Sequence, residues 1–251
     1  MSRRGAAIIA DPAHNADHRI AAIERSGTLR LALFPSFFYR RHPATGEPRG
    51  VGIEIARALA VRIGVALESA EHASPPPVVA ALASGAADVA LLGIDPARAA
   101  EVDFSPPILA ADFTYLVPQS SAVLTIADAD RSGTRVALVR HHAMDTALRG
   151  RLKVAAVVYA DTPDAAFARL QAGQADVLAG IRPGLLAYAA QTPGARVLAG
   201  RYGRNVIALA VKKSEPGWLS YVSDFATAAK ADGTVARAIE GAGLTGVEVE
   251  G

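Results

Sequence analysis

Cysteine is absent from the 251-residue sequence, which excludes disulfides, thiolate metal sites, a cysteine nucleophile and a cysteine lipid anchor. The redox compartment therefore stays undetermined. An excess of one charge is also absent, since 26 Lys and Arg residues face 24 Asp and Glu residues. With a net charge of +2 and no basic run, the sequence offers no phosphate-neutralising patch. A nucleic-acid partner is therefore not expected.

Long apolar runs are missing as well. Residues 113–127 lack charge but are too few and too polar to span a bilayer, which needs about 18 or more apolar residues. Arg3 and Arg4 resemble the basic start of a signal peptide. Asp11, however, ends the apolar run behind them before the roughly 7–15 residues that a signal requires. We interpret residues 1–17 as a frayed tail, either artificial or left from a signal, and a cytoplasmic location stays open.

What the sequence does contain is an internal repeat. With 51% hydrophobic and 20% charged residues, the chain suits a globular protein of one large or two small domains. Two segments recur in the same order, GTLRLAL at 27–33 as GTRVALV at 133–139, and ALASGAADV at 81–89 as RLQAGQADV at 169–177. Gly85 and Gly173 suit the left-handed position after a helix. The apolar runs after Asp88 and Asp176 predict strands buried on both faces of a parallel sheet.

Helical periodicity lies between these strands. Ile55, Leu59 and Ile63 recur every four residues and predict an amphipathic helix that Gly64 ends. Further helices are expected at 165–170, 221–231 and 235–241. Alternating strands and helices indicate the α/β class with right-handed crossovers, and the duplication indicates two similar lobes rather than one long sheet.

The duplication also predicts where a ligand binds. Ligands of open α/β sheets bind outside the carboxyl ends of the strands. If two lobes face each other, their strand-end loops share one cleft. These loops are residues 34–39 and 93–98 in the first half, and 140–145 and 180–182 in the second.

Several segments, in order, resemble the amino-acid-binding family (family 3) of type II periplasmic solute-binding proteins of ABC importers. The resemblance spans about residues 20–244. It rests on residues 27–32, 50–55, 82–88, 95–107, 211–213 and 230–234. The most specific match is DPARAAEVDFSPP at 95–107, which is similar to the family's T-x-x-R-x-x-x-V-x-F-S-x-P-Y motif.

The resemblance implies a clamshell of two lobes, each a mixed, mainly parallel sheet flanked by helices, joined by two hinge strands. Lobe 1 would comprise residues 1–110 and a returning segment, 206–251, and lobe 2 would comprise residues 111–205. The resemblance further implies a periplasmic monomer that captures a small ligand by hinge closure. Such a protein delivers its ligand to an ABC permease in the inner membrane and needs neither chemistry nor a cofactor.

Departures from the family pattern bear on the ligand. Arg98 stands where the family's arginine clamps the ligand carboxylate, which a guanidinium grips with two charge-assisted hydrogen bonds. Ile181 stands where an acid usually holds the α-amino group. Residues 140–145 (RHHAMD) replace the family's Ser/Thr-rich anion loop, while Ile108 and Ala56 replace the motif's tyrosine and a second acid.

The candidate ligand-binding residues lie in the four strand-end loops and are Phe34, Phe37, Tyr39, Gly93, Ile94, Asp95, Arg98, Arg140, His141, His142, Ala143, Ile181 and Arg182. Phe37 matches the family's stacking aromatic, whereas at least two of the neighbouring aromatics are expected in the lobe core. Asp95 and Asp145 are expected to cap helices. His141 and His142 are adjacent and do not share a helix face, so a metal site is not expected. No residue is assigned a catalytic role.

Acids are scarce in these loops, and burying a ligand ammonium without a carboxylate partner is costly. We therefore hypothesise that the ligand is an organic anion without an α-amino group, such as a dicarboxylate or an aromatic carboxylate. Three alternatives stay open: a conventional amino-acid-binding protein, a cyclohexadienyl (prephenate or arogenate) dehydratase-like enzyme, and an extracytoplasmic sensory module. For the enzyme, Ile181 leaves no general acid at the expected position.

Overall fold

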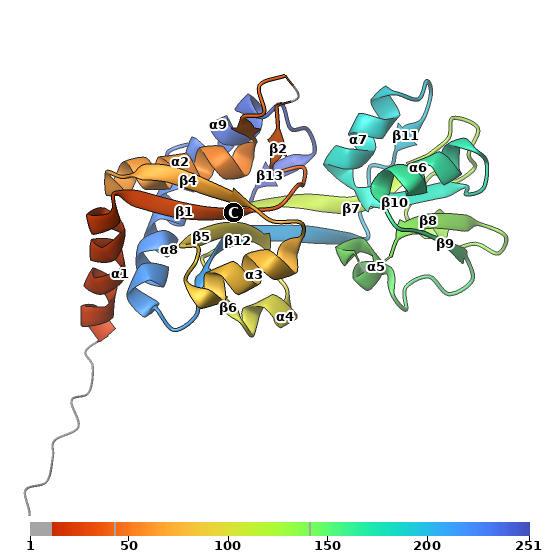
Figure 1. Cartoon of the computed structure of the whole chain (residues 1–251). Coiled ribbons are helices and arrows are strands. Elements are labelled where there is room, and N and C mark those ends of the chain that lie inside the picture. Colours follow the sequence, from red (N-terminus) through yellow and green to blue (C-terminus); the bar gives the residue numbers. More distant parts are fainter. Residues whose placement is uncertain (1–11, 43, 141) are drawn as a thin grey trace, which may run out of the picture. The chain divides into compact units, whose positions relative to one another are not determined.

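The computed structural model describes the backbone of residues 12–42, 44–140 and 142–251, with side chains from His18 onward within these ranges. The chain forms two compact units and passes between them at Ile108–Leu109, at Val206–Ile207 and again near its end, at Ala242–Gly243 and Glu250–Gly251. Each unit alternates strands and helices (Figure 1), which confirms the predicted α/β class.

The two units are each made of two main segments. Unit 1 comprises the residues up to Ile108, Ile207–Ala242 and the terminal Gly251. Unit 2 comprises Leu109–Val206 and Gly243–Glu250.

Unit 1 is built on a mixed sheet in the order β4, β1, β5, β12, with β6 also paired to β12. The strands are β1 (Thr28–Leu33), β4 (Ala66–Glu71), β5 (Val89–Gly93), β6 (Val102–Phe104) and β12 (Gly203–Lys212), whose residues up to Val206 belong to unit 2. β1 runs parallel to β4 and β5, whereas β12 is antiparallel to β5 and β6. A short hairpin of β2 (Arg40–Arg41) and β3 (Pro48–Arg49) lies between β1 and the next helix in the chain.

The helices of unit 1 are α1 (Pro12–Ser26), α2 (Val51–Ile63), α3 (Pro75–Ser84), α4 (Pro96–Ala99), α8 (Pro216–Ala231) and α9 (Thr234–Gly241). The predicted end of α2 is confirmed, because Gly64 has the left-handed φ of 85° and its N–H bonds to the last turn. α8 begins five residues earlier than predicted, with Trp218 fully buried in its first turn. The Trp218 Nε1 donates to the Asp88 carbonyl at 2.9 Å, which ties α8 to the start of β5.

Unit 2 is built on a sheet in the order β7, β10, β8, β9, with β11 and β13 also paired to β7. The strands are β7 (Leu109–Val117), β8 (Arg135–Val139), β9 (Ala156–Ala160), β10 (Val177–Ile181), β11 (Arg196–Val197) and β13 (Val247–Val249). β8 is parallel to β9 and β10, and β7 is antiparallel to β10. The helical segments are a 3-10 turn, η1 (Ala127–Ala129), α5 (Ala143–Leu148), α6 (Pro163–Gln171) and α7 (Arg182–Ala190).

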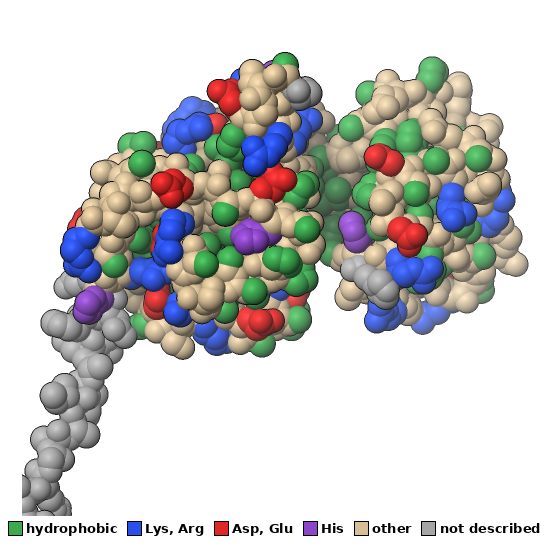
Figure 2. Space-filling model, in the orientation of Figure 1, with side chains coloured by type: hydrophobic (Ala, Val, Ile, Leu, Met, Phe, Trp, Pro, Cys, Tyr) green, Lys and Arg blue, Asp and Glu red, His purple; other side chains and the backbone are tan. Residues whose placement is uncertain are grey.

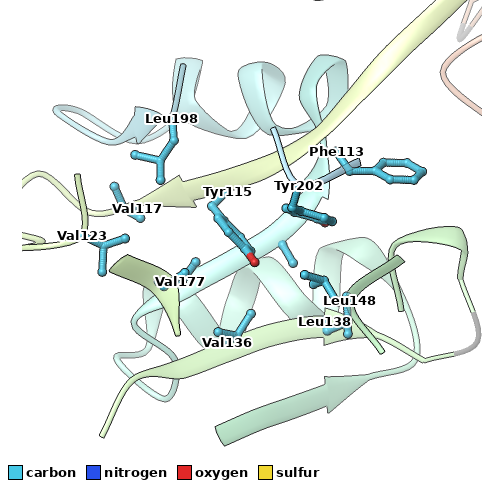
Figure 3. Packing of buried hydrophobic residues seen from close by; sticks show 12 residues of the cluster. Phe113, Tyr115, Val117, Val123, Val136, Leu138, Leu148, Val177, Leu198 and Tyr202 are labelled. Carbon is cyan, nitrogen blue, oxygen red and sulfur yellow. The ribbon is translucent and has the colours of Figure 1, made fainter. Parts of the chain in front are cut away.

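The core of unit 2 is partly aromatic (Figure 3). Tyr115 of β7 and Tyr202 pack with ring centroids 4.7 Å apart, and Phe113 lies next to Tyr202 at 6.0 Å. Leu138 of β8 and Leu148 of α5 close the same cluster. Burial raises the pKa of both tyrosines, so both hydroxyls stay protonated in the interior at neutral pH.

The repeat seen in the sequence is a repeated ion pair in the structure. In unit 1 the Asp88 carboxylate accepts from the Arg30 backbone N–H at 2.8 Å and from the Arg30 Nε and Nη2 at 2.9 and 2.7 Å. In unit 2 Asp176 accepts from the same three groups of Arg135 at 2.8, 3.0 and 2.8 Å. Each ion pair lies directly before the residues at which two parallel strands pair, β1 with β5 in unit 1 and β8 with β10 in unit 2. Asp176 therefore has a structural role in unit 2, as Asp88 has in unit 1.

Two expectations for the chain ends differ from the structure. Residues 12–17, expected in a tail, belong to α1, which packs along α8. Residues 243–250, expected in the returning segment of lobe 1, belong to unit 2, because Val247–Val249 pairs with the first strand residues of β7. A three-residue strand has too little periodicity to be recognised in a sequence. No helix in the described part of the chain has the length and apolar character needed to cross a membrane.

Candidate functional site

Arg98 is held in place by its own loop at the carboxyl end of β5. Asp95 is the N-cap of α4, and its Oδ1 accepts from the Arg98 backbone N–H at 3.0 Å, so the predicted cap is confirmed. The Arg98 Nη1 donates to the Gly93 carbonyl at 2.7 Å, and Nε pairs with the Asp95 Oδ2 at 2.9 Å. The side chain is 27% exposed, and the neighbouring Ile94 is exposed. These two contacts engage two of the five N–H groups of a guanidinium and fix its orientation.

The aromatic loop after β1 is divided between surface and core. Phe34 and Phe37 are partly buried. Phe34 packs against the α3 side of the core, and the Phe37 ring centroid lies 3.7 Å from that of Phe38. Phe38 and Tyr39 are buried, which confirms that at least two aromatics belong to the core.

Tyr39 is a correction to the predicted ligand-binding residues. Its side chain is 2% exposed, and its hydroxyl donates to the Glu71 carboxylate at the end of β4. Burial and this hydrogen bond raise the pKa of Tyr39 to about 12. Within unit 1 the residue is therefore structural, since neither its ring nor its hydroxyl reaches the surface.

In unit 2, the loop after β8 places Arg140 over an aromatic ring. The Arg140 Cζ lies 4.5 Å from the centroid of Tyr159, a cation–π geometry that orients the guanidinium. His142 occupies the N-cap position of α5 and Ala143 begins the helix, both exposed. Desolvation lowers the pKa of His142, which favours its neutral form at neutral pH. His141 lies outside the described residues.

Asp145 does not cap α5, so that prediction is wrong. It is the third residue of the helix and is buried. Its carboxylate accepts from the Tyr159 hydroxyl at 3.1 Å and pairs with Arg149 at 3.8 Å. Tyr159 thus connects the oriented Arg140 to a buried acid, and its pKa is raised, first by burial and then by this hydrogen bond.

The end of β10 carries Ile181, and Arg182 follows it. Of these two residues, only Ile181 is available for contact with a ligand. Ile181 is partly buried against the core of unit 2. The Arg182 side chain is 18% exposed, and its Nη1 donates to the Leu198 carbonyl at 3.0 Å. Its Nη2 contacts the carbonyls of residues 199 and 200 and the Asp112 carboxylate at 2.9–3.3 Å. Arg182 is therefore a structural residue, which corrects its prediction as a ligand contact.

Two residues next to the predicted site were not anticipated. Asp112 in β7 pairs with Arg182, Arg201 and Arg204, at distances of 3.3 to 3.6 Å. These partners are 70 or more positions away, so no local pattern predicts the cluster. Tyr159 lies near Arg140 because the parallel pairing of β8 and β9 aligns it with Leu138, two residues before Arg140, and this pairing too is seen only in the fold.

The described residues contain no group of three or more His, Asp or Glu side chains that could hold a metal ion. In chemical terms, each unit presents one oriented guanidinium at a strand end, Arg98 in unit 1 and Arg140 in unit 2. Such groups bind and orient anions.

Comparisons with known proteins identify the family and the fold of the chain. No curated protein sequence matches the chain. Among solved structures, the ancestral amino acid-binding protein AncCDT-1, a precursor of cyclohexadienyl dehydratase, is 25% identical with a TM-score of 0.73, covering 89% of this chain and 98% of its own. The solute receptor for L-cysteine of Neisseria gonorrhoeae is 25% identical with a TM-score of 0.72, covering 89% and 92%.

A third neighbour, the amino acid ABC transporter substrate-binding protein AbpA of Streptococcus pneumoniae bound to L-arginine, is 24% identical with a TM-score of 0.72, covering 88% and 97%. These neighbours confirm the predicted type II periplasmic-binding-protein fold class. Residues 32–241 match the sequence profile of the bacterial extracellular solute-binding proteins, family 3. This match covers most of the chain and confirms the resemblance drawn from its motifs. The chain belongs to family 3 of the bacterial extracellular solute-binding proteins.

Proposed function

We propose that this chain is the substrate-binding component of an ABC transporter and that it captures a small organic anion, a carboxylate without an α-amino group. In this proposal the strand-end loops of both units contact the ligand, and hinge closure encloses it. The protein acts in the periplasm as a monomer and delivers the ligand to a permease of the inner membrane. Family membership supports the transport role, as does the similarity to an ABC transporter substrate-binding protein of Streptococcus pneumoniae.

The observation that carries the ligand class is the apolar end of β10. Ile181 stands where the family resemblance expects the acid that holds an α-amino group, and it is partly buried against apolar neighbours. The acids of the four predicted strand-end loops are already engaged, Asp95 by Arg98 and Asp145 by Tyr159 and Arg149. A ligand ammonium enclosed there would lose its hydration without gaining a free carboxylate, which is costly.

The anionic part of the ligand is assigned to Arg98. Its guanidinium is oriented by Gly93 and Asp95 before a ligand arrives, so little side-chain entropy is lost on binding. Arg140, oriented by Tyr159, supplies a second cation from unit 2. Two oriented cations suit a dicarboxylate, and Phe37, in the loop after β1 of the same unit as Arg98, would suit an aromatic carboxylate.

Thermal unfolding in the presence of candidate ligands tests this proposal. We expect amine-free dicarboxylates or aromatic carboxylates to raise the Tm, with about 2.7 kcal/mol of stabilisation when the ligand is present at 100 times its Kd. L-amino acids at the same concentrations should leave the Tm unchanged. Stabilisation by L-amino acids, with none by amine-free acids, would show that the assigned ligand class is wrong.

A conventional amino-acid-binding function is the second candidate. It is favoured by the neighbours, since the Streptococcus pneumoniae protein is bound to L-arginine and the Neisseria gonorrhoeae protein is a receptor for L-cysteine. The same thermal screen separates the two candidates. AncCDT-1 is described as an amino acid-binding precursor of an enzyme, and we assign no catalytic role to the present chain.

A further inference from the structure

An open groove of about 1520 Å³ runs over unit 1, away from the strand-end loop that holds Arg98. Its walls are α2, α9 and the β2–β3 hairpin, and α2 and α9 pack against each other. The residues that α2 contributes are Glu54, Arg57, Ala58 and Val61, and those from α9 are Thr234, Arg237, Ala238 and Gly241. Both sets have the spacing i, i+3, i+4, i+7, so each is one face of its helix.

The rim of the groove is basic. Five arginines line it, namely Arg40, Arg41, Arg49, Arg57 and Arg237, against two acids, Glu47 and Glu54. Where Figure 1 places β2 and α9, Figure 2 shows Lys and Arg side chains gathered beside acidic ones. Several of these arginines have local partners, such as Glu71 for Arg41 at 2.8 Å. Arg40 forms no ion pair within the described chain.

The hairpin adds an unfavourable pairing of like charges. Arg40 and Arg49 are directly opposite each other in the β2–β3 ladder. Like charges at such positions destabilise a strand pair. Glu47 approaches Arg49 at 3.7 Å, which only partly offsets the repulsion, since both side chains are well exposed. An anionic group placed between the two arginines would remove it.

The floor of the groove is apolar and shallow. Val61 is 73% exposed, an unusual position for a large aliphatic side chain on a helix that buries most of its apolar residues. Ala58, Ala238 and Gly241 line the same groove, and their small size allows another backbone to approach closely. The volume exceeds the 300–1,000 Å³ typical of small-molecule pockets. Two packed helices with a free valley between them can accept a third helix.

We propose that this groove docks an acidic amphipathic helix of a partner protein, with its apolar face on Val61 and its carboxylates between Arg40 and Arg49. The partner is defined by this chemistry, a helix with Leu-type residues along one face and Glu or Asp beside them. This inference is independent of the ligand site and goes beyond the transport role.

Binding of a synthetic helix to the full chain tests the inference. The probe is a fluorescein-labelled 18-residue peptide with Leu on one helical face and Glu on its flanks, and anisotropy is measured in 50 and 300 mM NaCl. We expect binding that weakens with salt, and no binding of the same peptide with Lys in place of Glu. The double variant R40E/R49E should weaken binding at least tenfold, and Val61→Ser at least threefold.

The double variant keeps two like charges opposite each other but loses the contact of Arg49 with Glu47, so its Tm is measured beside that of the parent. The matched control is R25E/R169E, which makes the same change of net charge at the exposed Arg25 and the partly buried Arg169, both outside the groove, and should alter binding less than twofold. Equal weakening by the control, or no binding of the acidic peptide, would overturn the inference. So would R40E/R49E-sensitive binding to phosphatidylglycerol vesicles in place of the peptide, since the surface would then recognise a membrane.

Discussion

Arg98 illustrates how a side chain is prepared by its own loop. Strand β5 ends at Gly93, and Asp95 caps the following turn and pairs with Arg98 across three positions. The guanidinium is thus held before ligand binds. Because bidentate, charge-assisted bonds contribute about 1.5–3 kcal/mol each, its loss has a large expected effect on affinity.

We expect Arg98→Ala to weaken binding of the acid selected by the thermal screen by about 100-fold, as measured by titration calorimetry. Arg98→Lys should retain part of the affinity, because a lysine keeps the charge but loses the planar fork. Arg25→Ala, at an exposed position in α1, is the control and should bind like the parent. Unchanged affinity in Arg98→Ala would remove this residue from the site.

Ile181 allows a prediction of gained function. Replacing it by Asp introduces a carboxylate at the partly buried end of β10, where a ligand ammonium could pair with it. We expect Ile181→Asp to acquire stabilisation by L-amino acids in thermal unfolding. Ile181→Asn has the same shape without the charge and should not acquire it. A parent protein already stabilised as strongly as Ile181→Asp would contradict the prediction.

For single residues, the sequence was sufficient to predict a contact where the hydrogen-bond partners are close together in the chain. Asp95 stands immediately before Pro96 and an Arg-bearing turn, so its cap was predictable. Arg182 was misassigned because its partners are carbonyls at 198–200 and Asp112, which only the fold brings near. Asp145 was misassigned because its hydrogen-bond donor, Tyr159, comes from a neighbouring strand.

Among the elements, the duplicated strands owe their register to duplicated carboxylates. Asp88 and Asp176 make the same three contacts, yet their surroundings differ. Asp88 is 1% exposed and also pairs with Arg19 at 3.1 Å, whereas the Asp176 side chain is 41% exposed. Removing a buried charge leaves the charges of its partners uncompensated. When an exposed charge is removed, water replaces the contacts that it made.

We therefore expect Asp88→Asn to lower the free energy of unfolding by about 3 kcal/mol and Asp176→Asn to lower it much less, in urea titrations. The two variants are matched, since each removes one carboxylate oxygen from the same three-contact pattern. Equal losses would mean that burial does not govern the strength of the repeated pair.

Acid sensitivity is predicted for the loops of unit 2. Backbone N–H groups of residues 153–155 hold the pKa of Asp130 below its usual value of 3.8, and the Arg135 side chain does the same for Asp176. A lowered folded-state pKa stabilises the fold above the unfolded pKa, and this stability is lost as the pH falls through the folded pKa. We expect the Tm to fall below about pH 4. The variant D130N/D176N should show a flatter acid limb, and an unchanged limb would contradict the assignment.

The long elements were largely predictable, and the short ones were not. α2, α9 and the buried strands β5 and β10 follow from periodicity and from Gly stops. The hairpin strands β2 and β3 are two residues each, and β13 is three. Such segments are specified by the strands they join rather than by their own pattern.

For the whole molecule, the consequence of the proposed function is a change in size. The chain crosses between units at Ile108–Leu109, at Val206–Ile207 and twice near its end, so ligand contacts from both units would draw the units together around those crossings. A compact chain of 251 residues has a radius of gyration of about 18 Å. We expect the radius measured by small-angle X-ray scattering to fall toward this value when a stabilising carboxylate is added, because closure removes solvent from between the units. Arg98→Ala should show no decrease at the same concentration. A ligand that raises the Tm of the parent but leaves its radius unchanged would mean that one unit binds alone, and hinge closure would then be no part of the mechanism.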